Sequence, residues 1–482
     1  MTDQTSTAAA VYTEDVAPES YGLHTGVLGP VETLAQSVSA VAPSTSPSLT
    51  IPLVFALAGN ATWFVYLTAT AAMLLVGFCI SRFAKLSASP GSLYSYTADT
   101  LPPFFGVVAA WGLLLAYIAT GASVAGGALY YTNLIAQQFV HVEPPALLTL
   151  LLVCGAAGYV AYRDVKLSAE LMLWIEVGSV SLIVLVLTIM PIRFGLHLDM
   201  DQLHLRGSSF ASLGPALVLS MFSFVGFESA TTLGGEARNP LQTIPRAVLQ
   251  CAILAGIFFM LCSYSEVLGF RGESGALSES TSPLHHLAEK AGVAPLGVAI
   301  DFGALVSMFA CTLACTTAAA RVLLRMAHGG LLPKLLERTS KKHGTPEPAV
   351  VLAAGLMFVA TAGMELRSFN GSEMYDLLGS LSVFGFLTAY ALVALALPFA
   401  RRAVGQHSHL LAAVSIFTVL VLLMIAVFDL RSTADVLHAR IPWIYLAYIA
   451  SGIAWYLIRR KRLRAALRSP AESGSKIRSP QP

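Results

Sequence analysis

Apolar stretches about as long as a membrane-crossing helix recur along the chain, separated by short polar connections. Each is long enough to cross a hydrocarbon core of about 30 Å as an α-helix. Backbone polar groups in lipid must be paired within the segment, which favours helices over open strands. The pattern predicts an all-α, polytopic membrane protein with about twelve transmembrane helices. The predicted spans are 27–58, 61–83, 104–139, 144–161, 167–190, 211–234, 246–270, 296–326, 347–364, 375–400, 409–429 and 441–458.

Composition points the same way and excludes several classes of protein. Only 12% of the 482 residues are charged, whereas soluble globular proteins carry about 25%. All six cysteines fall inside apolar stretches, so no loop disulfide is expected. The histidines lie in loops, tails or at span ends, and no HExxH pattern or pair of mid-span aspartates occurs. We therefore predict no enzyme activity, no metal site and no cofactor, and the net charge of +2 gives no reason to expect a nucleic-acid partner.

Positive charge is distributed unequally between the two sides of the predicted membrane. With the N-terminus inside, the inside loops and the C-terminal tail hold 22 Lys and Arg and the outside loops hold seven, which together make all 29. The positive-inside rule therefore predicts that both termini face the cytoplasm. This count assigns every Lys and Arg to a loop or a tail, those near the ends of predicted spans included, and so leaves none in the interior of a span. The expected location is the inner (plasma) membrane of a bacterial-type cell, in contact with the lipid bilayer.

The first predicted span contains signs of local unwinding. Pro43 and Pro47 each lack an N–H group and interrupt a helix. Hydroxyl residues surround them, at Ser44, Thr45, Ser46 and Ser48. Non-helical backbone at membrane depth is tolerated only next to protein or a water-filled cavity. The kink and the hydroxyl cluster together favour a binding site over a kink that serves packing alone.

The sixth predicted span carries a glycine and an acid together, Gly226 and Glu228, inside Phe222–Ser229. A charge at the bilayer centre costs roughly 2.5–3.5 kcal/mol even on the lenient insertion scale. Glu228 is therefore a candidate functional residue, and the alternative is a protonated, hydrogen-bonded structural acid.

Broken spans one and six predict two five-helix repeats of opposite topology, whose broken helices face each other. Half-helix N-termini would attract a carboxylate and freed carbonyls would attract an amine. The predicted domains are a disordered cytoplasmic tail at 1–25, a transport core at 26–400 with repeats at 26–190 and 211–400, accessory helices eleven and twelve at 401–460, and a basic disordered cytoplasmic tail at 461–482.

Four segments carry a family resemblance: Pro43–Ser48, Ser89–Tyr96, Phe224–Glu228 with the following Glu236–Pro240, and Ala319–Pro333. With these segments the sequence resembles the amino acid–polyamine–organocation (APC) permeases over roughly residues 25–400. The resemblance implies the 5+5 inverted-repeat (LeuT-like) core with broken helices 1 and 6. It also implies secondary active transport of an amino acid by alternating access.

The resemblance also implies roles for individual residues. Ser44, Thr45 and Ser46 would bind a substrate carboxylate. Backbone carbonyls near Ala40 and Val41, and from Phe222 to Val225, would bind the amine. Phe224 would act as an aromatic lid and Phe227 would line the pocket. Glu228 would couple gating to protonation, and Glu176 of span five is either a second coupling acid or a buried structural acid.

The sequence departs from the family in two places. Span one lacks the common glycine-rich break, and span five lacks the Lys that some proton-coupled members place there. Tyr117 or Ser123 of span three is expected to add to the pocket. Ser307 and Thr312 of span eight are candidate sodium ligands, although such hydroxyls more often join helices.

The apolar, hydroxyl-containing pocket favours a neutral amino acid as the small-molecule substrate, in symport with protons. The alternatives are an amino acid or polyamine exchanger or facilitator, a permease-like nutrient sensor, and a channel. The 38 glycines permit close helix contacts without specifying between which chains, so no oligomeric state is predicted.

Overall fold

The computed structural model describes residues 21–194, 198–272, 276–403, 408–431 and 437–473. Within them the chain is almost wholly helical, and its one β-bridge joins Leu28 to Ala237. The α-helices are α2 (Pro30–Val41), α3 (Ile51–Ala58), α4 (Thr62–Ala84), α5 (Ser92–Ala98), α6 (Pro103–Phe139), α7 (Ala146–Arg163), α8 (Val165–Phe194), α9 (Met200–Leu203), α10 (Phe210–Phe222), α11 (Pro240–Gly269), α12 (Ala276–Glu279), α13 (Pro283–Lys290), α14 (Ala294–His328), α15 (Glu347–Glu365), α16 (Gly371–Ala403), α17 (His409–Arg431) and α18 (Ile441–Ser473). Five short segments have other helical geometries: the π-helix η2 (Ser46–Thr50) and the 3₁₀ segments η3 (Gly59–Ala61), η4 (Ser229–Leu233), η5 (Lys334–Glu337) and η6 (His438–Arg440).

These helices confirm the predicted polytopic, all-α fold. Among the described residues, ten helical stretches are long and apolar enough to cross a membrane. One of them, Pro30–Ala84, is 55 residues long and contains predicted spans one and two. Predicted span six appears as the shorter apolar helix α10 followed by η4. Each of the twelve predicted spans therefore has a helical counterpart.

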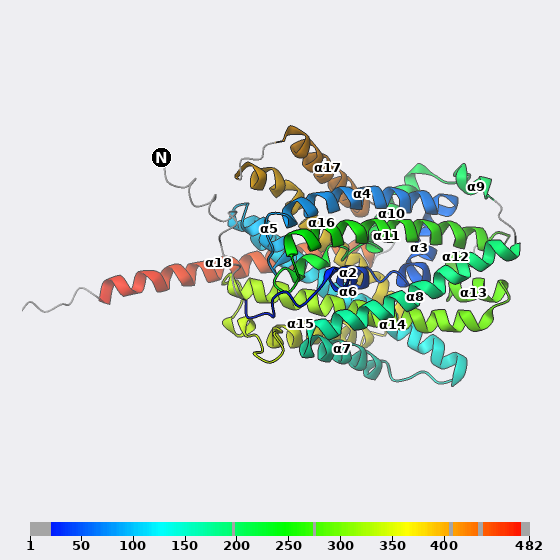
Figure 1. The fold of residues 1–482 in the computed structure, drawn as a ribbon, viewed down its shortest axis with the longest axis horizontal. Helices are drawn as coiled ribbons and strands as arrows, with labels where there is room; N and C mark the ends of the chain where they lie inside the picture. The colour runs from blue at the N-terminus through cyan, green and yellow to red at the C-terminus, as the bar shows by residue number, and fades with distance from the viewer. Residues whose placement is uncertain (1–20, 195–197, 273–275, 404–407, 432–436, 474–482) are drawn as a thin grey trace, which may run out of the picture.

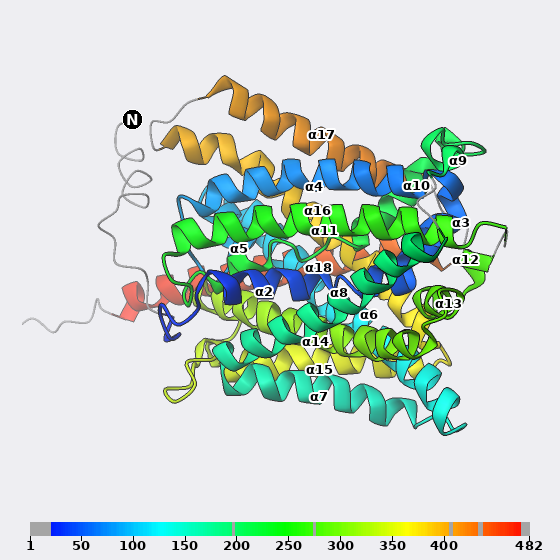
Figure 2. The same cartoon turned by 45° about the vertical axis from the view of Figure 1, so that its right-hand side comes forward.

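The helices run side by side along the long axis of the molecule (Figures 1 and 2). Helix α2 begins and α18 ends at one end of the bundle, which we call the terminal end. Helices α9, α12 and α13 lie at the opposite end, which we call the distal end. The terminal segment 1–20 lies outside the described residues. Helix α18 continues to Ser473, so the beginning of the tail predicted to be disordered is helical.

Small residues bring the central helices into close contact. Helix α6 packs against both α14 and α16. A Cβ atom on Gly385 of α16 would approach the carbonyl oxygen of Gly112 on α6 to 2.4 Å, and one on Gly371 would approach that of Gly126 to 2.5 Å. Close backbone contact through small residues is the usual way for helices to associate in lipid. Leucines of α7, α8, α15 and α17 are exposed in contrast, as is expected of helices that face lipid.

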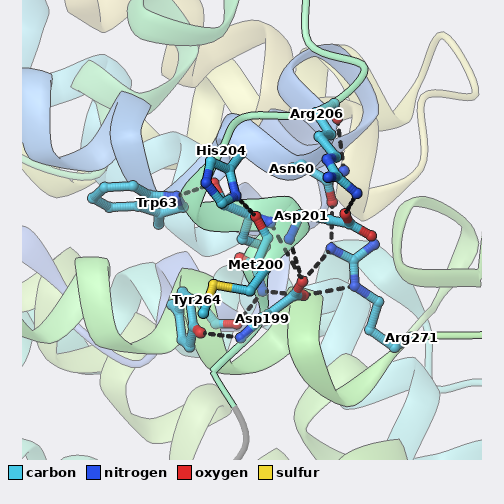
Figure 3. A network of polar contacts seen from close by, with 10 residues as sticks. Asn60, Trp63, Asp199, Met200, Asp201, His204, Arg206, Tyr264 and Arg271 are labelled. Carbon is cyan, nitrogen blue, oxygen red and sulfur yellow. Dashed lines mark hydrogen bonds and ion pairs between the residues drawn. The ribbon is translucent and has the colours of Figure 1, made fainter.

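A polar network closes the distal end of the bundle (Figure 3). The guanidinium of Arg271 donates hydrogen bonds to Asp199 at 2.6 and 2.9 Å and to Asn60 at 2.7 Å. The indole of Trp63 donates to the Gln202 carbonyl at 3.0 Å. This network, which we call the distal clamp, ties the connection between α3 and α4 to α9 and to the residues that follow α11.

Candidate functional site

The first broken helix is interrupted at the position that its prolines predict. Helix α2 ends at Val41, and Ala42 adopts the left-handed conformation with φ 49°. The Ala42 N–H donates to the carbonyls of Val38 and Ser39, each at 3.1 Å. The chain resumes as the π-helix η2, a rare geometry that is frequent at functional sites.

The second broken helix is interrupted at a point that lies beside the break in the first. Helix α10 ends at Phe222, and the chain turns through Gly226, whose φ is +89°. A Cβ atom on Gly226 would lie 2.8 Å from the Cβ of Ala40 and 3.0 Å from its carbonyl oxygen. A glycine is therefore required here both by the backbone conformation and by the close approach of α2. The two breaks face each other, as the sequence predicts.

Hydrogen bonds hold the halves of the broken helices together toward the terminal end. Ser229 Oγ donates to the Gln36 carbonyl at 3.0 Å, and the Ala230 N–H donates to Ser37 Oγ at 2.9 Å. The Leu28 N–H donates to the Glu236 carbonyl at 3.1 Å. Helix α2 and segment η4 are therefore joined along their lengths and form one structural unit.

A small cavity lies where the two breaks meet. Its volume is about 10 Å³, which is about the space that one water molecule needs. Every lining residue is buried, so the cavity is closed in this conformation. The lining residues are Ala40, Val41, Ala42, Thr45, Ser46, Thr120, Val124, Phe222, Val225, Cys311 and Tyr375.

Two hydroxyl groups at this cavity lack a hydrogen-bond partner among the described residues. They are Thr45 Oγ1 in the first break and Thr120 Oγ1 on α6, and both are buried. A buried polar group without a partner costs about 1–3 kcal/mol. Ser44 Oγ is likewise buried and unpaired, although Ser44 does not line the cavity. The first break thus offers polar groups that a ligand can satisfy.

The predicted binding residues divide into two groups. Thr45, Ser46, Phe222 and Val225 line the cavity. Ser44, Phe224 and Phe227 do not line it in this conformation. The ring of Phe224 packs edge-on against Phe259 of α11, and that of Phe227 packs against Tyr390 of α16. The structure therefore does not place Phe224 as a lid, because the non-helical turn after Phe222 changes the direction of the side chains that follow.

A different aromatic pair, Phe222 with Tyr375, lies against the cavity. Their rings meet edge-to-face with centroids 5.2 Å apart, and the Tyr375 hydroxyl lies 2.7 Å from Thr50 Oγ1. Both residues also line a second cavity of about 320 Å³ between α3, α10, α16 and α18. One aromatic layer thus separates the small cavity from this larger vestibule on its distal side.

The sequence analysis missed five lining residues: Ala42, Thr120, Val124, Cys311 and Tyr375. Its choices from span three have other partners, since the Tyr117 hydroxyl binds Glu228 and Ser123 Oγ donates to the Tyr375 carbonyl at 2.5 Å. Thr120 lies one turn from each of them on α6. The sequence signal for Thr120 was a hydroxyl residue among the small residues of α6. The sequence did not show which face of α6 lies toward the cavity.

Glu228 is held by two tyrosines at the terminal side of the second break. Tyr117 of α6 donates to Oε1 at 2.8 Å, and Tyr390 of α16 donates to Oε2 at 2.5 Å. The side chain is fully buried. The carboxyl thus connects the broken helix to two central helices through two hydrogen bonds.

Glu176 lies in a separate place from Glu228. Both of its carboxyl oxygens lie 3.0 Å from Ser307 Oγ. It borders an apolar groove of about 380 Å³ together with Val41 and Pro43 of the first break. Each candidate sodium ligand has a hydrogen-bond partner in this structure: Ser307 binds Glu176, and Thr312 Oγ1 donates to the Met308 carbonyl at 3.0 Å.

A buried ion pair lies between η4 and α14, toward the terminal end. Arg321 of α14 binds the carboxylate of Glu236, and neither side chain is exposed. Its Nη1 also donates to the Thr317 carbonyl at 2.9 Å. The prediction that no Lys or Arg lies inside a span is therefore wrong for Arg321, whose charge is neutralised inside the protein.

Comparisons with known proteins give one consistent family. The model of the family described as "Amino acid permease" matches residues 47–468. The chain is 23% identical over 363 residues to the branched-chain amino acid permease BcaP of Bacillus subtilis, covering 72% of this chain and 74% of that protein. It is also 23% identical over 369 residues to BcaP of Lactococcus lactis, covering 72% and 76%. A methylthioribose transporter of Bacillus subtilis is 25% identical over 308 residues, covering 60% and 64%.

Proposed function

The chain belongs to the amino acid permease family, and we propose that it moves a neutral, apolar amino acid across the membrane in symport with protons, by alternating access. It is a multi-pass membrane transporter rather than an enzyme. We place its terminal end in the cytoplasm, because the predicted inside loops carry 22 of the 29 Lys and Arg. The distal end then faces outward from the inner membrane.

The observation that supports this function most directly is the cavity at the contact between the two breaks. Helix α2 ends there at Val41, and a helix C-terminus carries partial negative charge that favours an ammonium group. The chain resumes at Ser46, and the partial positive charge of that helix start favours a carboxylate. The unpaired hydroxyl of Thr45 adds a donor on the carboxylate side.

The rest of the lining supports an apolar substrate side chain. Val124, Phe222 and Val225 supply hydrocarbon surface, and no charged residue lines the cavity. Two relatives named as branched-chain amino acid permeases agree with this inference. Ligand pockets usually measure about 300–1,000 Å³. The Phe222–Tyr375 layer therefore has to separate so that the cavity and the vestibule of about 320 Å³ become one space.

Proton coupling is supported by the position of Glu228. A carboxylate charge buried at membrane depth is expensive, and its contacts join the broken helix to α6 and α16. Its protonation state is therefore expected to differ between conformations that bury it and conformations that hydrate it. Glu176 borders the first break and is either a second coupling acid or a structural one.

The test is uptake of labelled amino acids by the purified protein in liposomes. One sample carries an inward proton gradient with the membrane potential clamped at zero, and a second carries no gradient. Accumulation of branched-chain amino acids only under the gradient is the expected result. Uptake that ignores the gradient but needs internal substrate indicates an exchanger, and simple equilibration indicates a facilitator. Competition by methylthioribose but not by amino acids would refute the substrate class.

A further inference from the structure

A further buried acid, Glu266, lies on α11 at the distal side of the cavity. It is fully buried, one turn before α11 ends at Gly269. Neither of its carboxyl oxygens has a hydrogen-bond partner among the described residues. Glu228 and Glu176 each have hydroxyl partners, so Glu266 differs from both. A structural acid is normally hydrogen-bonded when buried, and Glu266 therefore requires another explanation.

The surroundings of Glu266 connect it to the second break. Tyr66 of α4 lies within electrostatic range of its carboxyl. The Tyr66 hydroxyl in turn lies 3.1 Å from Ser223 Oγ, in the non-helical turn that follows α10. Both Tyr66 and Ser223 are buried. A change of charge at Glu266 can thus act on the broken helix through two hydroxyl groups.

Among the described residues, no charged group compensates Glu266. Tyr66 and Cys262, the latter on α11 itself, are the described groups within its electrostatic range. Two titratable groups near this end of α11 have partners of their own: Lys290 of α13 donates to the Gly269 carbonyl at 2.7 Å, and the ring of His286 packs on Phe270. The other charged or titratable groups on the helices that pack against α11 are Glu32 on α2, Arg82 on α4, Lys166, Glu170, Glu176 and Arg193 on α8, and His285 and Glu289 on α13.

The charge of the Glu266 carboxyl in the closed conformation follows from its burial without a hydrogen-bond partner. An isolated carboxylate transferred from water to an apolar site is so unfavourable that the group takes up a proton instead. A carboxyl in contact with water at neutral pH is ionised. Closing the distal end over Glu266 is therefore coupled to the binding of one proton.

We propose that Glu266 is a proton-binding site that must be loaded before the distal end can close, and that the Tyr66 and Ser223 hydroxyls link its protonation to the second break. The proton comes from water on the distal side and converts the carboxylate to a neutral acid. It leaves to water that enters when the terminal end opens. This inference rests on the proposed proton symport, and adds an acid on the distal side of the cavity to Glu228 on its terminal side.

The experiment compares the wild type with Glu266→Gln, which is always neutral, and with Glu266→Asp, which retains an acid. The matched control is Glu289→Gln, which removes an acid with a half-exposed side chain at the same end of the bundle. Each protein is reconstituted in liposomes with the membrane potential clamped. Two rates are measured for each: accumulation driven by an inward proton gradient, and exchange of labelled for unlabelled substrate at equal concentrations on both sides.

The expected result separates coupling from binding. A gradient of one pH unit can support an accumulation of about tenfold for each coupled proton. Glu266→Gln is expected to lose gradient-driven accumulation while it retains exchange, and its exchange is expected to become independent of external pH. Glu266→Asp is expected to retain part of the accumulation, and Glu289→Gln all of it. Retained exchange also shows that the variant is folded.

Two results would overturn the proposal. One is Glu266→Gln with wild-type accumulation and a wild-type pH profile. The other result comes from infrared spectra of the purified proteins. These spectra test Glu266 even if the wild type ignores the proton gradient, an outcome that would refute the proposed symport. A protonated-carboxyl band that is present in the wild type at neutral pH and absent from Glu266→Gln supports proton binding, and identical spectra refute it.

Tyr66→Phe tests the link to the break separately from the proton site. This variant keeps the ring that packs near Phe259 but removes the hydroxyl bound to Ser223. We expect the infrared band of Glu266 to remain while gradient-driven accumulation falls at least severalfold. Wild-type accumulation in this variant would remove Tyr66 from the pathway.

Discussion

The contact between the two broken helices can be tested by a single added methyl group. Gly226→Ala places a Cβ atom 2.8 Å from the Ala40 Cβ and 3.0 Å from the Ala40 carbonyl oxygen. It also forces a side chain onto a residue with φ +89°. The change leaves polarity and charge untouched, so its effect reports only on the geometry of the break.

The magnitude follows from two separate costs. Holding an L-residue in the left-handed region costs roughly 1–2 kcal/mol. Inserting a methyl group into a packed contact costs typically about 1–3 kcal/mol more. The closed conformation is therefore destabilised by about 2–5 kcal/mol relative to conformations in which the breaks separate. If substrate binding requires the closed contact, the lower limit corresponds to roughly a thirtyfold loss of affinity.

The assay is equilibrium binding of a labelled substrate to the purified protein, with uptake measured in parallel. Gly355→Ala is the matched control, because a Cβ atom there meets nothing within 4 Å in the middle of α15. Adding Ala40→Gly to Gly226→Ala removes one of the two clashing groups and is expected to restore part of the affinity. Affinity within threefold of the wild type for Gly226→Ala would refute the assignment of this contact to the binding site.

Three further predictions concern the layers on either side of the cavity. Tyr375→Phe removes the hydroxyl bond to Thr50 and is expected to speed substrate release by several-fold, as measured by the dissociation rate, with little change in thermal stability. Arg321→Ala leaves the Glu236 carboxylate buried and unpaired, which costs about 3–5 kcal/mol; a clearly lower unfolding midpoint is expected, and removing both charges together should recover most of it. Burial alone would raise the pKa of Asp199, but the hydrogen bonds from Arg271 and from Gln202 outweigh it and hold this pKa below its usual value. The stabilising effect of the ionised Asp199 is therefore fully present above about pH 4 and lost as the pH falls through the lowered pKa. Asp199→Asn should therefore lower the unfolding midpoint at pH 7, and its difference from the wild type should shrink as the pH falls below about 4.

Backbone interruptions were predictable from sequence because they follow from local chemistry. Pro43 and Pro47 cannot complete a helical ladder, and Gly226 beside Glu228 marks a place where an apolar helix changes its geometry. Both breaks occur where these residues stand. The twelve spans were predictable for the same reason, since helix length is set by the thickness of the membrane.

Side-chain directions around the breaks were not predictable from the same patterns. Helical periodicity stops at Phe222, so the sequence does not show that this ring faces the cavity while Phe224 turns toward α11. Tyr375 is separated from Phe222 by about 150 residues of chain, and only the packing of α16 brings them together. Such contacts depend on how helices are rotated about their axes.

The burial of charged residues inside the bundle was not predictable, because these residues stand near the ends of predicted spans. Arg321 stands close to the end of predicted span eight, where the count of positive charges assigns it to a loop, and its partner Glu236 follows a different span. Glu266 stands near the end of predicted span seven, where an acid is unremarkable because it can reach water. Its burial follows from the packing of other helices, α4 among them, against α11.

The two barriers around the cavity are of different physical kinds, and this difference bears on how the proposed cycle proceeds. On the distal side one aromatic layer, a single hydroxyl bond to Thr50 and the buried, unpaired acid Glu266 close the path. On the terminal side the closed path contains the ion pair between Arg321 and Glu236. In the proposed cycle, closing the distal side requires a proton on Glu266, whereas opening the terminal side requires an ion pair to be hydrated or rearranged. External protons then act directly on the distal barrier, which would give a proton gradient the directional effect that symport requires.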